Sequence, residues 1–191
     1  GTLTVSGTTT ATTDVNDQVI TLGTLVSSGN VILTTQGTAG HATIDNGTTA
    51  LGVEGTVAGN LALTSGGAIT DSAALTVSGT TTVTTDVDDI AIVLGTLASS
   101  GNVILTTQTA GGNTGHVTID NTTTALGVQG TVNGNLALTS GGAITDSNTL
   151  TVAGTTTVTT DVDDIAIDLG TLVSSGNVIL TTQGTTGHAT I

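Results

Sequence analysis

A long internal repeat constrains this chain more than any other feature of its sequence. The string LTVSGTTT begins at Leu3 and again at Leu75, and the near-copy LTVAGTTT begins at Leu150. The two intervals between these starts are nearly equal, so the repeat has an almost constant period. Self-similarity at a fixed period is the signature of architectures that stack one structural unit on the next. The repeat therefore favours a rod-like stack over a single closed core.

The copies predict one continuous domain. The second copy is longer than the first by three residues, which lie between Gln108 and His116 in a stretch rich in Gly, Asn and Thr. Such an insertion indicates a surface loop. Because the sequence opens and stops within the pattern, we interpret it as a window of a longer array. The expected domain covers residues 1–191, with copies at 3–74 and 75–149 and a partial copy at 150–191.

Each copy divides further into three segments, and each segment predicts one turn of a coil. GNLALTS at Gly59, GTTTVTT at Gly79 and GNVILTT at Gly101 are variants of one strand start. Every segment contains three short stretches of apolar residues alternating with Thr, as in half-buried strands. The expected fold class is all-β, a parallel β-solenoid (β-helix) of about eight three-strand rungs, with three rungs in each super-repeat. We expect a right-handed coil, because crossovers between parallel strands are right-handed.

Aligning the segments predicts two unbroken ladders of identical side chains. Neighbouring residues of a strand face opposite sides, so we expect the Ile ladder to line the interior and the Thr ladder to face solvent. The Ile ladder comprises Ile20, Ile44, Ile69, Ile92, Ile119, Ile144, Ile167 and Ile191. The Thr ladder comprises Thr12, Thr34, Thr64, Thr84, Thr106, Thr139, Thr159 and Thr181.

The composition excludes several classes of function. The chain has no Lys or Arg against 14 acidic residues, which gives a formal charge of −14, so it lacks the cations that bind nucleic-acid phosphates. The absence of Cys excludes disulfides and thiolate metal sites. No apolar run approaches the ~18 residues that a membrane-spanning helix needs. We therefore expect no nucleic-acid partner and no membrane span.

Two groups of Asp residues are candidate calcium ligands. In the first group, at the ends of strands, we expect Asp45 one rung below Asp71, and three further carboxylates on successive rungs ~5 Å apart. Oxygen ligands without nitrogen or sulfur suit Ca²⁺. The alternative is that each Asp caps a turn and is screened by counterions. The candidates are Asp45, Asp71, Asp120, Asp146 and Asp168 in the first group, and Asp86, Asp88, Asp89, Asp161, Asp163 and Asp164 in the second, which lies in the two DVDD corners.

The remaining polar side chains recur with the repeat and form no catalytic set. His41, His116 and His188 are one position seen three times, in the motifs GHATI and GHVTI, and we expect exposed loop residues. Asn46 and Asn121 lie in sequons for N-glycosylation. A Ser/His/Asp triad needs one distinct constellation, whereas everything here is periodic. We therefore expect no enzymatic activity and no cofactor other than calcium.

The phrases GNLALTSGGAITDS, LTVSGTTT and GNVILTT resemble the repeats of large bacterial surface proteins of the filamentous haemagglutinin and autotransporter-adhesin type. The resemblance covers the whole chain. It implies a secreted protein at the cell surface, whose expected role is a structural component of an extracellular filament or fibre that continues or assembles end to end. The alternative is a stalk segment of an adhesin that presents its binding domain elsewhere. The expected partners are other copies of the chain and cell-surface or matrix polysaccharide.

Overall fold

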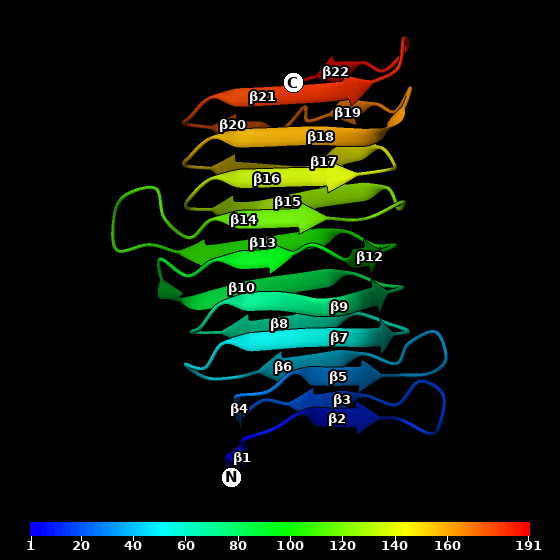
Figure 1. Cartoon of the computed structure of the whole chain (residues 1–191), viewed down its shortest axis with the longest axis vertical. Coiled ribbons are helices and arrows are strands. Elements are labelled where there is room, and N and C mark those ends of the chain that lie inside the picture. The colour runs from blue at the N-terminus through cyan, green and yellow to red at the C-terminus, as the bar shows by residue number, and fades with distance from the viewer.

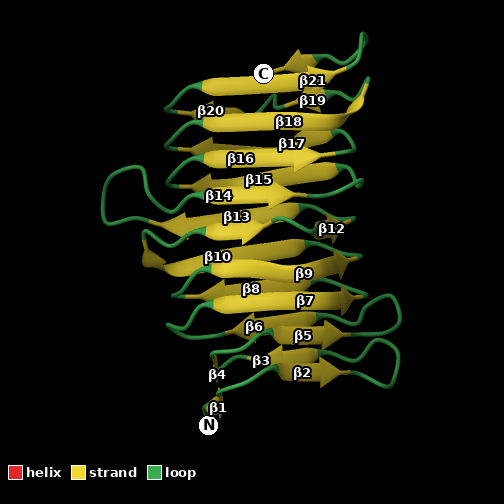
Figure 2. Cartoon of the chain, in the orientation of Figure 1, coloured by secondary structure: helices red, strands yellow, loops and turns green.

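The computed structural model describes all 191 residues and is a coil built from β-strands. Figure 1 shows the turns rising from the N-terminus to the C-terminus, and Figure 2 shows strands joined by loops with no helix between them. All strand pairings are parallel. No helix is long and apolar enough to cross a membrane. The predicted parallel β-solenoid is confirmed.

Two long sheets form the opposite faces of the coil, and we call them sheet I and sheet II. Sheet I contains β2 (Thr9–Thr12), β5 (Val31–Thr34), β7 (Leu51–Val57), β9 (Ile69–Val77), β11 (Ile92–Leu94), β12 (Leu97–Ser99), β14 (Val117–Asp120), β16 (Leu136–Ser140), β18 (Thr156–Asp163) and β21 (Val178–Gln183). Sheet II contains β3 (Ile20–Leu22), β6 (Ala42–Asp45), β8 (Leu61–Ser65), β10 (Thr81–Asp88), β13 (Val103–Gln108), β15 (Leu126–Val132), β17 (Ile144–Val152), β19 (Ile167–Asp168), β20 (Leu172–Ser174) and β22 (Ala189–Thr190). A third, two-stranded sheet pairs β1 (Leu3–Val5) with β4 (Leu25–Ser27).

Each turn crosses the core twice, and the expected three strands per turn are present in the turns that begin at β2, β10 and β18, whereas the other turns have two strands. Strand β9 shows the reason, because this single strand pairs with both β11 and β12. The second and third apolar stretches of a segment therefore lie in one sheet. Opposite Val53 and Gly55 of β7, the register shifts because β9 has two additional residues between Asp71 and Leu75, and this bulge lets β9 bend without ending. The order of strands along each sheet gives about nine turns, compared with the eight expected.

The coil is right-handed, as the crossover preference predicts. In Figure 1 the strands of sheet I, such as β7 and β16, lie nearer the viewer and point to the right as the chain rises. Strands of sheet II, such as β8, lie behind them and point to the left.

One super-repeat occupies three and a half turns, because the chain crosses the core seven times from β6 to β13. Leu33 lies in sheet I, whereas its counterpart in the second copy, Leu105, lies in sheet II. Leu180, the counterpart in the third copy, lies in sheet I again. Figure 1 shows the same alternation in the loops, since the β5–β6 loop protrudes from one edge and the β13–β14 loop from the opposite edge. Successive copies therefore present the same residues on opposite faces.

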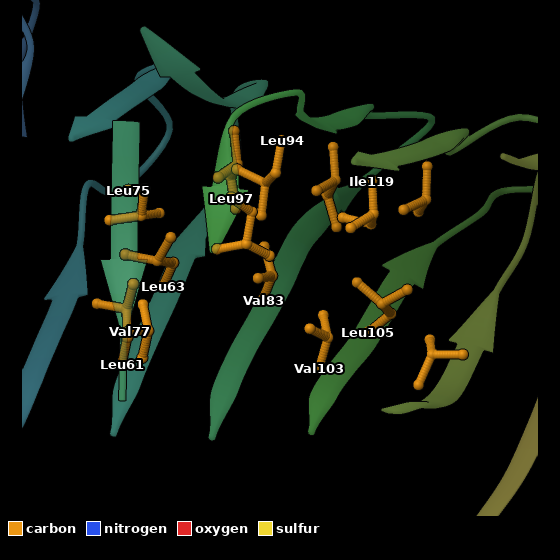
Figure 3. Close-up of a cluster of buried hydrophobic side chains, with 14 of the residues drawn as sticks. Leu61, Leu63, Leu75, Val77, Val83, Leu94, Leu97, Val103, Leu105 and Ile119 are labelled. Atoms are coloured by element: carbon orange, nitrogen blue, oxygen red, sulfur yellow. The ribbon is translucent and has the colours of Figure 1, made fainter. Parts of the chain in front are cut away.

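The space between the two sheets is filled by 33 buried apolar residues in one continuous cluster. Leu63, Val83 and Leu105 stack in successive turns of sheet II and are at most 1% exposed. Figure 3 shows these side chains packing with Leu75 and Leu97 from sheet I. The alternation of apolar residues with Thr thus predicted the inward face correctly.

The register divides both predicted ladders into shorter runs. Ile20 pairs with Ala42 and not with Ile44. Thr34 pairs with Thr56, because the predicted next member of the ladder lies in the other sheet. The half-turn between copies separates Thr34 from Thr64, and a two-residue difference in register separates Ile20 from Ile44. The runs that remain are Thr12–Thr34, Thr64–Thr84–Thr106, Thr139–Thr159–Thr181, Ile69–Ile92 and Ile144–Ile167. Orientation is as expected: the Ile side chains are buried, except Ile191 at the last residue, and the Thr side chains face outward.

Candidate functional site

The acidic corners hold the loop of the following turn. The last Asp of each corner, at Asp17, Asp89 and Asp164, has a positive φ of 62, 65 and 63° respectively, a conformation that Asp adopts more readily than most residues. In the first corner, Asp17 Oδ1 accepts hydrogen bonds from the backbone N–H groups of Thr38 at 2.7 Å and Ala39 at 2.8 Å. The carboxylate therefore orders the loop one turn above it.

The third corner repeats this arrangement. Asp164 Oδ1 accepts hydrogen bonds from the N–H groups of Thr185 at 2.9 Å and Thr186 at 2.8 Å. Hydrogen bonds to a carboxylate favour its charged form. The N–H of Thr186 accordingly lowers the pKa of Asp164 below its ordinary 3.8, and the N–H of Ala39, followed by that of Thr38, lowers the pKa of Asp17 in the same way.

The second corner differs because the loop above it carries the three additional residues. Asp89 accepts a hydrogen bond from the Thr114 hydroxyl instead of from two backbone N–H groups. The other candidates in the corners, Asp86, Asp88, Asp161 and Asp163, are exposed. The corners thus combine one carboxylate that organises a loop with others that face solvent.

Four of the five Asp residues in the first group accept hydrogen bonds from backbone N–H groups in turns. Asp45 Oδ1 accepts a hydrogen bond from the N–H of Gly47 at 2.9 Å, and Asp120 makes the same bond to Thr122 at 2.8 Å. The two carboxylate oxygens of Asp71 accept hydrogen bonds from the N–H groups of Gly95 and Thr96, both at 2.8 Å. Asp146 Oδ2 accepts from Thr171 N–H at 2.8 Å. These bonds are those of the turn-capping alternative.

The expected vertical ladder of these carboxylates is wrong. Asp45 lies in sheet II and pairs with Thr64, whereas Asp71 lies in sheet I. Asp120 likewise lies in sheet I, and Asp146 and Asp168 lie in sheet II. The half-turn between copies again separates residues that the sequence aligns.

Calcium binding therefore remains a prediction. The structure does not stack the carboxylates in the ladder on which that prediction was based. No group of three or more His, Asp or Glu side chains in the structure is placed to hold a metal ion. The prediction requires a chelator to lower the melting temperature at low salt, and an unchanged melting temperature would contradict it.

Two buried asparagines, Asn46 and Asn121, have a structural role that their sequons do not reveal. Asn46 and Asn121 are both 0% exposed. Asn46 Oδ1 accepts the N–H of Ser27 at 2.7 Å, and its Nδ2 donates to the carbonyl oxygens of Ser27, Thr49 and Ala50 at 3.0, 3.2 and 2.8 Å. In the folded chain this amide is inaccessible to glycosylation, which excludes the sequon interpretation for the native state.

Asn121 repeats these contacts in the second copy. Its Oδ1 accepts from Ser99 N–H at 2.7 Å, and its Nδ2 donates to the carbonyl oxygens of Ser99, Thr124 and Ala125. The available signal was positional, because DNGTTAL and DNTTTAL both place Asn directly after the last residue of a strand. A polar residue retained at the same point of two copies marks a structural cap.

The histidines also belong to the turns. His41 Nδ1 accepts a hydrogen bond from the N–H of Asn60 at 2.7 Å, and His116 makes the equivalent bond to Asn135 at 2.9 Å. Asn60 Oδ1 in turn accepts the N–H of Thr80, one turn higher, at 2.9 Å. Side-chain acceptors of one turn thus bind backbone donors of the next along this corner. The histidines remain separate from one another.

Comparison with known proteins identifies the repeat. Residues 39–95 and 114–171, more than half of the chain, match the family described as repeats of unknown function (DUF5649). The chain belongs to this family. Each matched DUF5649 repeat spans six crossings of the core, β6 to β11 and β14 to β19, and β13 between them supplies the seventh. No curated protein and no solved structure matches the chain.

Proposed function

We propose that this chain is a segment of an extracellular structural filament or surface fibre whose turns continue end to end. The observation that carries the proposal is the uninterrupted parallel ladder with one apolar core along its whole length. Such an architecture gains stability from every added turn, and its length is not limited by a closed core. The resemblance to bacterial surface repeats supports placing the filament outside the cell.

The surface offers little for a catalytic role. Its single pocket is an open hollow beside the first turn, lined by residues that include Thr24, Leu25 and Asp45. Lys and Arg, the residues that trypsin-like proteases cleave after, are absent from the chain. Both features support a passive structural role in an environment that contains proteases.

The test is immunogold labelling of the source cells with an antibody against this chain, followed by cryo-electron microscopy of the labelled material. We expect continuous thin filaments at the cell surface, labelled along their length, with an axial repeat of ~4.8 Å. Finite rods that end in a globular domain would establish the adhesin stalk instead. Label confined to the cell interior would overturn both functions.

A further inference from the structure

Both faces of the coil carry the same six-residue surface patch. In sheet II the outward side chains of β8, β10 and β13 form three stacked pairs in register, which we call the threonine patch of sheet II: Ala62 and Thr64, Thr82 and Thr84, Ile104 and Thr106. In sheet I the strands β16, β18 and β21 form the same pairs: Ala137 and Thr139, Thr157 and Thr159, Ile179 and Thr181. The two patches occupy corresponding positions of successive copies, and they lie on opposite faces because a super-repeat contains three and a half turns.

We propose that these patches are lateral contacts between copies of this chain, so that rods join side by side into ribbons. Each rod carries one patch on either face and can therefore bind a neighbour on both sides. The inference is independent of end-to-end continuation, since a single rod of 191 residues already carries both patches.

The chemistry of the patches suits an uncharged partner with the same geometry. Each patch consists only of Ala, Thr and Ile, so methyl groups and hydroxyls form its surface. Parallel in-register ladders repeat at ~4.8 Å, and such ladders of identical side chains pack tightly against a second sheet with the same repeat. A second copy of this chain supplies that repeat on its own patches.

The area of the contact grows with the length of the rods. Nine turns at ~4.8 Å rise about 43 Å, and five residues of strand span about 17 Å. An offset of ~17 Å between neighbouring rods leaves about 26 Å of overlap, or roughly 440 Å² of facing surface. A stable interface typically buries ~800 Å² on each partner, so the contact between two rods of this length is weak and strengthens with every further copy.

The carboxylates lie around the patches and control the contact. Asp45 pairs in register with Thr64, directly below the patch of sheet II, and Asp120 occupies the same place beneath Thr139 in sheet I. Asp86 is exposed beyond the β10 edge of the patch. No basic residue offsets these charges. Because salt screens exposed charges, we expect lateral contact to strengthen as ionic strength rises.

The test measures the width of assemblies by electron microscopy and their mass by sedimentation, at neutral pH and from about 0.01 M to about 1 M NaCl. We expect the natural chain to form ribbons more than two rods wide as salt rises, with neighbouring rods offset by ~17 Å, the rise of three and a half turns. Thr84→Asp should block the patch of sheet II, and Thr159→Asp that of sheet I. With this offset the patch of sheet II on one rod meets the patch of sheet I on the next rod, so either variant alone, like the double variant, should stay one rod wide.

Two controls keep the result specific. Ser100→Asp adds the same charge at an exposed turn outside both patches and should form ribbons like the natural chain. Thr84→Lys and Thr159→Lys together reduce the net negative charge but still place a charge in each patch, so this variant should also stay one rod wide. Circular dichroism verifies that each variant is folded.

Two results would overturn the proposal: a natural chain that stays one rod wide at every salt concentration, or a double variant that is as wide as the natural chain. Rod length reports separately on end-to-end continuation, so failure of the lateral contact is distinguishable from failure of the filament.

Discussion

Single side chains complete the turns of this coil where the backbone alone leaves donors and acceptors without partners. The Asn121 side chain forms hydrogen bonds with the backbone N–H and carbonyl oxygen of Ser99 in the turn below. It also donates to the carbonyl oxygens of Thr124 and Ala125 in its own turn. Such a side chain joins two turns at a point where no strand pairing exists. Its contribution is large because the groups that it satisfies are buried.

Replacing this residue should destabilise the coil locally. Asn121→Ala removes four hydrogen bonds and leaves the buried N–H of Ser99 without a partner, so we expect a loss of about 3 kcal/mol. Amide hydrogen exchange at Ser99 and the urea midpoint measure this loss. The exposed loop residue Asn113 is the control, because Asn113→Ala should change stability by less than ~0.5 kcal/mol. Equal effects of the two substitutions would contradict the assigned cap.

The carboxylates that hold loops should make those loops sensitive to acid. The pKa of Asp17 is lowered below 3.8 by the N–H groups of Ala39 and Thr38, so its stabilising effect is complete above the unfolded value and is lost as pH falls through the folded value. We expect the carboxyl carbon of Asp17 to titrate below 3.8 in NMR spectra. The amides of Thr38 and Ala39 should exchange faster over the same pH range. A midpoint at or above 3.8 would refute this role.

Residue patterns predicted the interior better than the caps. Alternation along a strand identifies inward residues such as Leu63 and Leu105, because burial follows from the two-residue period alone. The role of Asn46 depends on Ser27, in the preceding turn, and becomes visible only when the turns are in register. One copy of the sequence therefore does not distinguish an exposed glycosylation site at Asn46 from a buried side chain that caps a turn.

At the scale of elements, bulges decide how many strands make a turn. The register shifts between β7 and β9 and between β15 and β17, where one residue of β7 or β15 faces three residues of its partner. Each bulge lets β9 or β17 bend as one strand where the sequence suggests two separate strands. The three-strand rung was inferred from apolar stretches, and those stretches do not reveal whether the chain turns between them.

The bulge glycines should not tolerate a side chain. Gly130 has a φ of 117°, and a Cβ atom there would overlap the carbonyl oxygen of Leu105. We expect Gly130→Ala to cost about 3 kcal/mol, as the sum of backbone strain and a steric clash. Gly95 provides the matched control, since a Cβ there meets nothing within 4 Å. The difference between the two urea midpoints measures the cost, and similar midpoints would exclude this explanation of the bulge.

At the scale of the whole molecule, the sequence predicted a parallel coil. It did not predict which face of the coil the equivalent residues of successive copies occupy. Repetition and alternation suffice for a stack of strands, and the structure confirms that stack. Whether equivalent residues of two copies lie on the same face depends on the number of times that a copy crosses the core. An even number keeps them on one face, and the seven crossings found here place them on opposite faces. The half-turn broke the predicted Thr ladder and separated Asp45 from Asp71, whereas the Ile ladder is also broken by two-residue shifts in register, as between Ile92 and Ile119.

The half-turn also has a consequence for inheritance. Tandem copies of similar sequence are prone to unequal recombination, which adds or removes whole copies. Each such event would change the reach of the rod by ~17 Å. It would also rotate everything beyond the junction by half a revolution. A gene of this kind therefore changes the length of the rod and the orientation of whatever follows it together, and only the gain or loss of an even number of copies leaves that orientation unchanged.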